Sequence, residues 1–318
     1  MVESNVLINK SLFLKRFFGW FLITSLIIFM FNNVLNLSFD IPFAINFFSK
    51  GNIWSLIPLL GYVVAFFVSF YISLKFSQKS LKWDSSNLNN FNLYFIRSCF
   101  WAVLLIGVVD FFIAFMRVED IFNIIFDDTL VRALKKPSFV CTYIHIPLTC
   151  ISFLIGFFTR TIGFSWLALM IVCAELIIVI TRFVFSYEQS FMGDLVRYWY
   201  AALFLFASAY TLFEDGHVRV DVFYTNLKVK TKAYINAIGS ILLGVSTCVS
   251  ILFVGFNGTQ SIINSPILNF EITQTGSIGM FVKYQLAAFL GIFAISMLIQ
   301  FVSYYFFSVS NIKKLEKS

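Results

Sequence analysis

Charged side chains are scarce in this chain of 318 residues: only 12% are Asp, Glu, Lys or Arg, whereas a typical soluble domain has about 25%. Hydrophobic residues make up 59% of the sequence, and the mean hydropathy is +0.87. So little charge excludes an ordinary soluble globular domain. The composition is typical of a polytopic helical membrane protein.

Metal-binding and redox motifs are also lacking. The cysteines are odd in number and form no C-x-x-C pair, whereas a zinc site or disulfide framework needs closely spaced, paired ligands. We therefore interpret them as small buried hydrophobic residues and expect no cofactor. The five are Cys99, Cys141, Cys150, Cys173 and Cys248. The chain has only two histidines, His145 and His217, and no H-E-x-x-H motif.

Long apolar runs are what the chain has in place of these motifs. A helix needs about 20 apolar residues to cross a bilayer core, and an open sheet cannot satisfy its edge groups in lipid. The sequence therefore predicts an all-α protein with about eight transmembrane helices. The fourth run holds His145 and Pro147 and could instead be re-entrant or tilted. The runs cover roughly residues 17–37, 53–74, 95–116, 139–159, 164–186, 195–213, 233–256 and 284–307.

The basic residues indicate the orientation of these spans. With the N-terminus inside, fifteen of the 23 Lys and Arg residues fall on the inner side and eight on the outer side, which favours cytoplasmic placement of both termini. The net charge of +7 lies at the ends of apolar runs, so it does not indicate a nucleic-acid partner. The first run lacks a small-x-small cleavage site and is interpreted as a retained helix.

A polar interval, Arg117–Lys136, follows the third run. Its apolar residues recur near helical spacing, which fits either a helix lying in the membrane interface or a plain connecting loop. It suggests a division of the chain into an N-terminal extension of three helices with this interfacial segment, residues 1–138, and a second helical domain, residues 139–318.

Two acidic residues, Asp110 and Glu175, fall inside predicted spans. A charge at that depth costs about 2.5–3.5 kcal/mol on insertion scales, so each is expected to face protein or water. A proton relay or cation site is one interpretation. We favour a structural role, either a helix–helix hydrogen bond or a neutral, protonated carboxyl. Arg182 lies seven residues after Glu175, on the same helix face, and could help to neutralise it through an intervening group or another helix.

A dense polar segment, Glu214–Tyr224 with the sequence EDGHVRVDVFY, follows the sixth run. It could be an active site, a metal site or a shaped surface at the membrane boundary. No nucleophile motif accompanies it, and a second histidine is not nearby. We interpret it as a fixed corner at the inner face that holds two helices in register, with Gly216 ending the preceding helix.

This segment resembles the signature of a known family. The pattern Gly216-His217-x-Arg219-Val220-Asp221, within Ala209–Tyr224, resembles that of the DctQ-type small membrane subunit of TRAP transporters, the tripartite ATP-independent periplasmic transporters. The resemblance covers roughly residues 160–308 and leaves the first three spans outside it. One departure is that Phe191, Met192 and Gly193 precede a lone Asp194 where the family has a Trp and two glutamates. The other matching positions include Arg182, Asp194-Leu195-x-Arg197-Tyr198, Glu271, Gly276, Gly279, Lys283 and Gln300.

The resemblance implies a non-enzymatic subunit of a bacterial inner-membrane transporter. In such a system a periplasmic protein captures an organic anion such as a carboxylate, and a large permease carries it with sodium. The small subunit would act as a scaffold for the permease, surrounded by lipid, and help to dock the binding protein. The residues it assigns to structure and subunit contacts are Arg182, Asp194, Arg197, Glu214, Gly216, His217, Arg219, Asp221, Glu271 and Lys283.

The alternative is a membrane-bound redox or metal-binding protein that uses His145 and His217 as ligands. The predicted topology disfavours it. His145 falls near the outer end of the fourth span and His217 at the inner face, so about 30 Å of bilayer core separates them. One cofactor could not contact both.

We expect Arg219→Ala or Asp221→Ala to lower solute uptake, because losing either charge at this corner loosens assembly with the large subunit. Co-purification of the two subunits, measured beside uptake, checks this. Variants that assemble normally, yet take up solute with a weaker substrate affinity, would contradict the structural role.

Overall fold

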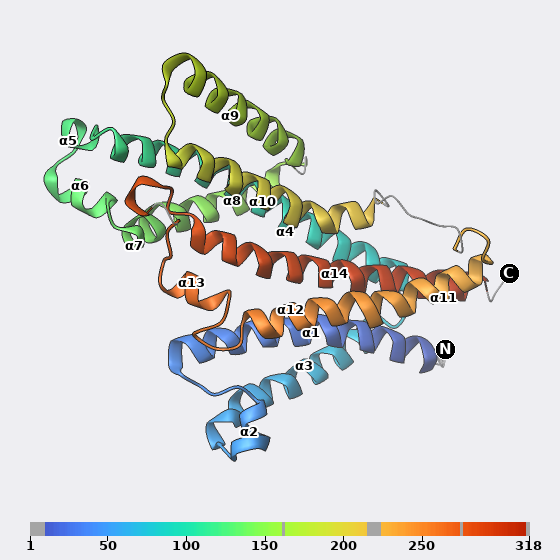
Figure 1. The fold of residues 1–318 in the computed structure, drawn as a ribbon. Coiled ribbons are helices and arrows are strands. Elements are labelled where there is room, and N and C mark those ends of the chain that lie inside the picture. Colours follow the sequence, from blue (N-terminus) through green and yellow to red (C-terminus); the bar gives the residue numbers. More distant parts are fainter. Residues whose placement is uncertain (1–9, 161–162, 215–223, 274–275, 316–318) are drawn as a thin grey trace. The chain divides into compact units, whose positions relative to one another are not determined.

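The computed structural model describes residues 10–160, 163–214, 224–273 and 276–315. Within these residues every regular element is a helix and no strand is present (Figure 1). The all-α membrane fold expected from the sequence is thereby confirmed.

Seven helices in the described ranges are long and apolar enough to cross a membrane, and each corresponds to a run predicted from the sequence. Four of them are single helices: α1 (Lys10–Phe39), α4 (Leu81–Val118), α9 (Phe164–Phe185) and α14 (Lys283–Leu315). Three are composite: η1 (Ile53–Ser55) with α3 (Leu56–Lys75); α7 (Pro137–Val140), η2 (Cys141–His145) and α8 (Ile146–Phe158); and α11 (Val229–Gly239), η3 (Ser240–Val245) and α12 (Ser246–Gly255).

The eighth predicted run, residues 195–213, lies within α10 (Ser190–Phe213). With 24 residues this helix is long enough to span, but Asp194, Arg197 and its tyrosines make it more polar than the seven. Its buried residues recur every three or four positions from Phe191 to Ala209. α10 is therefore amphipathic and packs one full face inside the protein.

Shorter helices fill the connections. They are α2 (Ile45–Lys50), α5 (Phe122–Ile125), α6 (Asp128–Leu134), α13 (Asn264–Leu268) and η4 (Gly276–Ile278).

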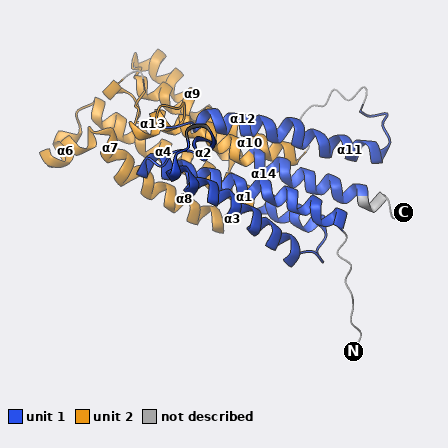
Figure 2. Cartoon of the chain, turned by 90° about the horizontal axis from the view of Figure 1, so that it is seen from below, with its two compact units in different colours: residues 1–90, 217–258, 297–318 blue, residues 91–216, 259–296 orange. Residues whose placement is uncertain are grey.

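The chain forms two compact units, each assembled from separate stretches of sequence (Figure 2). Unit 1 contains residues 1–90, 217–258 and 297–318, and unit 2 contains residues 91–216 and 259–296. The long helices α4 and α14 contribute residues to both units. The domain boundary near residue 138, inferred from the polar interval, stays a prediction.

Unit 1 contains a polar seam between α1 and α3. Thr24 Oγ1 lies 2.7 Å from Ser69 Oγ and donates to the Ala65 carbonyl, while Asn32 Nδ2 donates to the Pro58 carbonyl at 3.2 Å. Hydrogen bonds between helices satisfy groups that lipid cannot. Asn32 therefore lies within the first span and joins α1 to α3.

A buried ion pair fixes α1 to the start of α4. Arg16 Nε lies 2.8 Å from Asp84 Oδ2, and both side chains are inaccessible to solvent. The Arg16 guanidinium also donates to the carbonyls of Phe76 and Lys79, and Trp20 Nε1 donates to the other Asp84 oxygen at 3.0 Å. Because α1 starts at Lys10, Arg16 lies within the helix and is buried, although the apolar run read from the sequence starts only near residue 17.

The α11–α12 helix and α14 pack closely in the same unit. A Cβ on Gly244 would overlap the ring of Phe301, so a small residue is needed for the two helices to approach. Further along, Asn236 Nδ2 donates to the hydroxyls of Tyr224 and Tyr304 at 2.8 and 3.0 Å.

In unit 2, α10 packs against α4 through an equally close approach. The Trp199 indole lies over Gly107, where a Cβ would collide with it, and its Nε1 donates to the Val103 carbonyl at 3.2 Å. Arg97 of α4 donates to the carbonyls of Gly156 and Thr159. Arg97 thus caps the C-terminal end of α8, whose last carbonyls have no partner within the helix.

The fourth predicted span is helical from Pro137 to Phe158. The π-helical segment η2 precedes Pro147. A proline clashes with the carbonyl four residues before it, here that of Tyr143 within η2, and a wider π turn relieves this crowding. The proline is therefore accommodated without breaking the helix.

The polar interval Arg117–Lys136 is neither one interfacial helix nor a plain loop. It folds into α5 and α6, whose Phe122, Val131 and Leu134 pack in a buried cluster with Ile113 and Phe281. The helical spacing noticed in the sequence reflects packing of these short helices within unit 2.

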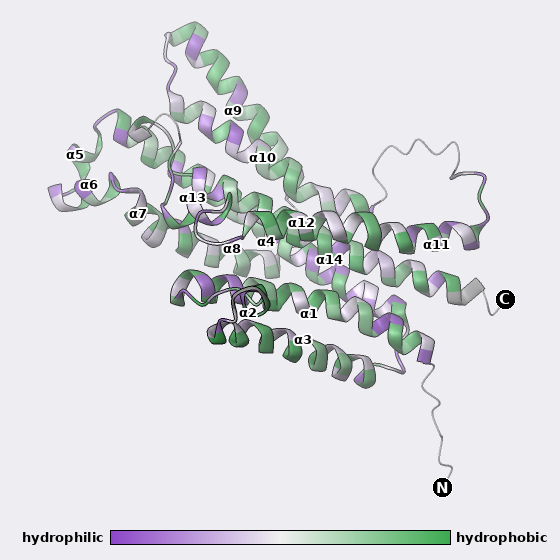
Figure 3. Cartoon of the chain, turned by 60° about the horizontal axis from the view of Figure 1, so that its bottom comes forward, coloured by the Kyte–Doolittle hydropathy of each residue, from purple (hydrophilic) through white to green (hydrophobic). Residues whose placement is uncertain are grey.

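Hydrophobic residues cover most of the long helices, including their exposed sides (Figure 3). On α3, for example, Leu60, Val64 and Phe67 are exposed. Such surfaces suit contact with lipid chains.

We expect Arg16→Ala to lower the free energy of unfolding by about 3–5 kcal/mol, because it leaves the Asp84 carboxylate buried without its partner. Lys10→Ala, on the exposed start of the same helix, serves as the control and should change little. Thermal or denaturant unfolding of the detergent-purified protein measures both. Equal stability of the two variants would show that Arg16 does not hold α1 in place.

Candidate functional site: a buried polar network

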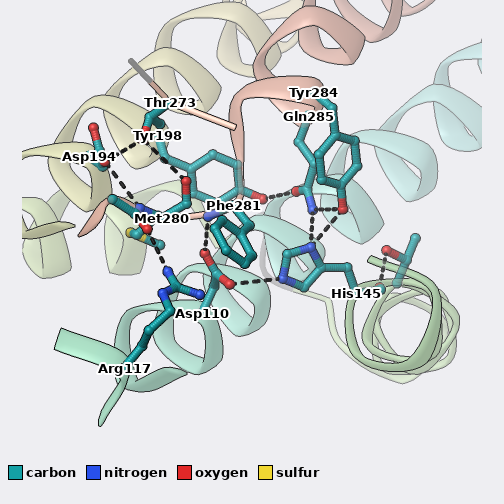
Figure 4. Close-up of polar contacts among 12 residues, drawn as sticks. Asp110, Arg117, His145, Asp194, Tyr198, Thr273, Met280, Phe281, Tyr284 and Gln285 are labelled. Atoms are coloured by element: carbon teal, nitrogen blue, oxygen red, sulfur yellow. Dashed lines mark hydrogen bonds and ion pairs between the residues drawn. The ribbon is translucent and has the colours of Figure 1, made fainter. Parts of the chain in front are cut away.

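Asp110 lies at the centre of a polar network in unit 2 (Figure 4). It sits in the C-terminal third of α4, and its side chain is fully buried. Oδ2 accepts a hydrogen bond from the Phe281 backbone N–H at 2.8 Å, and Oδ1 lies 3.3 Å from Nε2 of His145. Neither Oδ1 nor Nε2 makes a hydrogen bond to a described residue, so each has the other as its nearest charged or polar contact. A buried carboxylate needs such partners on both oxygens.

His145, in η2, has both ring nitrogens engaged. Opposite Asp110, its Nδ1 lies 2.6 Å from the Tyr284 hydroxyl and 3.1 Å from Nε2 of Gln285. An amide nitrogen can only donate, so Nδ1 is the acceptor and the proton of a neutral ring belongs on Nε2, facing Asp110. The hydrogen bonds thus assign the tautomer of His145.

The network continues through α14 to α10. Gln285 Nε2 also donates to the Tyr284 hydroxyl at 2.8 Å, and its Oε1 accepts from the Tyr198 hydroxyl. The Tyr198 hydroxyl donates to Gln285, and Gln285 donates to His145 and to Tyr284, so the hydrogen bonds run from α10 towards His145. Such a directed series of hydrogen bonds is mutually reinforcing in an apolar interior.

Two further charges hold the loop that leads into α14. Asp194 Oδ2 accepts from the Met280 backbone N–H at 3.1 Å and the Thr273 hydroxyl at 2.9 Å. Arg117 donates from Nε to the Ser277 carbonyl at 2.8 Å and from Nη2 to the Gly279 carbonyl at 2.6 Å. Its guanidinium carbon also lies 3.8 Å from the centre of the Phe281 ring, a cation–π contact.

The same loop is closed by two residues that the family resemblance had singled out. Lys283 Nζ lies 2.7 Å from Glu271 Oε2, and the Tyr284 N–H donates to the Glu271 carbonyl at 3.0 Å. Both side chains remain partly exposed, so the ion pair itself contributes little to stability. Its geometry nevertheless fixes where the loop enters α14.

Near this end of the unit, the turn after α9 meets the end of α4. The Tyr187 hydroxyl donates to Glu119 Oε1 at 2.6 Å. Burial, together with the adjacent Glu119 carboxylate, raises the pKa of Tyr187 to about 12. The phenol therefore stays protonated and remains a donor at any physiological pH.

An apolar cavity of about 240 Å³ adjoins the network. Its polar lining comes mainly from His145, Tyr198, Tyr284 and Gln285, and its remaining walls are mostly aliphatic or aromatic. These polar groups already bond to one another. They are therefore arranged for holding helices together rather than for recognising a polar solute.

The other predicted residues lie apart from this network. Arg182 Nε pairs with Glu188 Oε2 at 3.2 Å instead of serving Glu175, and both side chains are exposed. Glu175 is exposed on α9, and Arg197 and Glu214 are exposed on and after α10. Of the acidic pair predicted to face protein or water, the structure thus buries Asp110 within the protein and leaves Glu175 on its surface.

Gly216, His217, Arg219 and Asp221 lie outside the described residues, so the inner corner remains a prediction from sequence. Among the residues described, no group of three or more His, Cys, Asp or Glu side chains could hold a metal ion. Both nitrogens of His145 are occupied by protein groups, which disfavours it as a ligand in the alternative redox or metal-binding function.

Sequence reasoning did not find Arg117, Tyr284 or Gln285 as members of a site, nor Tyr198 beyond its place in a family motif. One signal was available: Gln285 and Tyr284 are polar residues at the start of a long apolar run, and His145 interrupts another. Polar side chains within spans normally find partners inside the bundle. Their pairing, however, could not be read from the sequence.

Comparison with known proteins finds a family model that matches part of the chain. Residues 168–306 match the family model described as tripartite ATP-independent periplasmic transporters, DctQ component. The matched region begins in α9, contains α10, α11–α12 and most of α14, and agrees with the resemblance drawn from residues 160–308. No curated protein and no solved structure matches the chain.

Asp110→Leu should lower the free energy of unfolding by about 1–3 kcal/mol, because the buried Phe281 N–H is left without its acceptor. It also removes the close contact of the carboxylate with His145. His145→Leu should be costly for the same reason. Because the two side chains share one contact, the double variant should cost less than the sum, with a coupling of about 0.5–3 kcal/mol. Unfolding of the purified variants measures this.

The exposed Asp128→Ala variant controls for loss of a carboxylate and should be neutral. Strictly additive effects of Asp110→Leu and His145→Leu would show that the network is not a single cooperative structure.

Proposed function

We propose that this chain, whose residues 168–306 match the family model of the DctQ component of the tripartite ATP-independent periplasmic transporters, is a static scaffold for the transporter's large membrane subunit. The family match is the observation that carries the proposal. In this role the chain widens and stiffens the part of the complex that stays fixed while the large subunit moves its solute.

The hydrogen bonds within the chain support a rigid, static role. Arg97 and Arg117 hold backbone carbonyls at a helix end and in a loop of unit 2, and Arg16 does the same in unit 1. In unit 2, Asp110 and Asp194 hold backbone N–H groups of one loop. A moving transport domain needs elements with two arrangements, whereas these bonds favour a single one.

The polar loops of unit 2 suit docking of a binding protein. With both termini in the cytoplasm of a bacterial inner membrane, the end of α4, the turn between α9 and α10, and the loop before α14 all face the periplasm. They carry the Tyr187–Glu119 hydrogen bond and the Glu271–Lys283 ion pair. We propose this fixed periplasmic end as the surface that the soluble binding protein contacts.

The transported solute is proposed to be an organic anion such as a carboxylate, taken up by the large subunit with an ion gradient, most simply sodium. The polar groups of the unit 2 network bond to one another, which is consistent with a solute site that lies in the large subunit.

We expect proteoliposomes containing this chain alone to accumulate no solute under a sodium gradient. Uptake should appear only when the large subunit and the binding protein are also present, and the two membrane subunits should co-purify from mild detergent. Sodium-driven accumulation by this chain unaided would refute the scaffold function, and so would failure of the two subunits to associate.

A further inference from the structure

Helix α9 is attached to unit 2 along a narrow strip. Only Leu167 and Ile171 are buried among its 22 residues, and it contacts chiefly α10. An apolar cavity of about 200 Å³, lined in part by Met170 and Ile177, lies between it and α4 and α10. In Figure 1, α9 diverges from the neighbouring α10 along its length. Most of its surface is therefore available to a neighbour.

Glu175 lies near the middle of that surface. At 1.5 Å per residue, α9 is about 33 Å long, and Glu175 is close to its midpoint, so an α9 that spans the bilayer places this carboxyl near the midplane. The side chain is exposed, and no described residue makes a hydrogen bond or ion pair with it. Arg182, on the same face, is occupied by Glu188.

Exposure to lipid would explain the apolar surface of α9, but it does not explain Glu175. A charged side chain at the centre of a spanning helix costs about 2.5–3.5 kcal/mol, and intramembrane acids almost always face protein or water. α3 provides the contrast within the same chain. It is similarly exposed, yet it carries no acidic or basic residue before Lys75 at its end. α3 has the surface of a lipid-facing helix, and α9 does not.

We propose that the Glu175 face of α9 is the contact surface for a transmembrane helix of the large membrane subunit. That helix places a lysine, arginine or protonated histidine opposite Glu175 at mid-bilayer depth. This inference rests on the proposed function, which supplies the partner. Charge complementarity selects it over a second copy of this chain, because a symmetric contact through this face brings two Glu175 carboxylates together.

Both the apolar side chains of this surface and the charge of Glu175 would stabilise the contact. Small and branched side chains around Glu175, among them Ala168 and Val179, allow close packing with another helix. In the low-dielectric bilayer core a paired charge is strongly favoured over an unpaired one. Glu175 would thus add specificity, since a helix without a cation at that depth leaves the acid unmatched.

The test is a photo-crosslinking pair in the co-expressed complex. A photoreactive phenylalanine analogue replaces Val179 on α9 in one sample and Val64 on α3 in the other. The two valines are comparably exposed, at 48% and 54%. The expected result is an adduct with the large subunit from position 179 and not from position 64. An adduct from position 64 alone, or from position 179 only to a second copy of this chain, overturns the proposal.

Glu175→Leu tests the charge separately. Since truncating one member of a buried charge pair weakens association strongly, we expect the amount of large subunit that co-purifies to fall at least about tenfold. Glu175→Gln, which still accepts and donates hydrogen bonds, should lose less. Thermal unfolding of each variant alone should match the wild type, because Glu175 has no partner within the described chain. Unchanged co-purification with Glu175→Leu refutes the ion pair.

Experiments on the wild-type complex distinguish a failure of the proposed function from a failure of the proposed α9 contact. If the unmodified subunits fail to co-purify, the proposed function is wrong and this inference falls with it. If they co-purify and position 179 gives no adduct with the large subunit, the proposed function stands and the α9 contact is wrong.

Discussion

A buried carboxylate in a membrane protein must find donors within the protein, and Asp110 shows how much of unit 2 follows from that constraint. Its two oxygens contact the Phe281 N–H and the His145 ring. His145 can face Asp110 only because its other nitrogen accepts from α14, and Gln285 on α14 is oriented in turn by Tyr198 of α10. One costly charge thus fixes four helical segments and a loop relative to one another.

The buried arginines are likewise satisfied by partners within the protein. Arg16, Arg97 and Arg117 each end on backbone carbonyls at the end of a helix or in a loop. Such carbonyls have no partner within a helix and no water in a bilayer. The guanidinium offers several donors in a fixed geometry, so one side chain can satisfy two carbonyls and define where a segment stops. These arginines therefore stabilise the fold, in addition to any effect of their charge on the orientation of the helices in the membrane.

The contrast between Asp110 and Glu175 links the fold to assembly. Both are acids within spans, and both carry the same cost in hydrocarbon. Asp110 is satisfied inside the subunit and so contributes to rigidity. Glu175 is not satisfied by any described residue, and an additional chain is the simplest way to satisfy it. The proposed scaffold function requires both kinds of residue: one that keeps the helices of this chain in place and one that selects its neighbour.

The positions of the helices were determined by the sequence alone, because the length of an apolar run and the limits it must meet in lipid are local properties. The seven spanning helices lie where apolar runs predicted them, and the family match covers the region whose motifs resembled it. The fourth run is helical even around Pro147, where the π-helical segment η2 accommodates the proline.

The pairing of residues between helices was decided only by the tertiary structure. Arg16 meets Asp84 across 68 residues, and Asp110 meets His145 across 35. Most of these helices are apolar on all sides, so hydrophobic periodicity does not indicate which face turns inward. Only the packed arrangement sets the rotation of each helix, and that rotation buried Asp110 while leaving Glu175 on the surface.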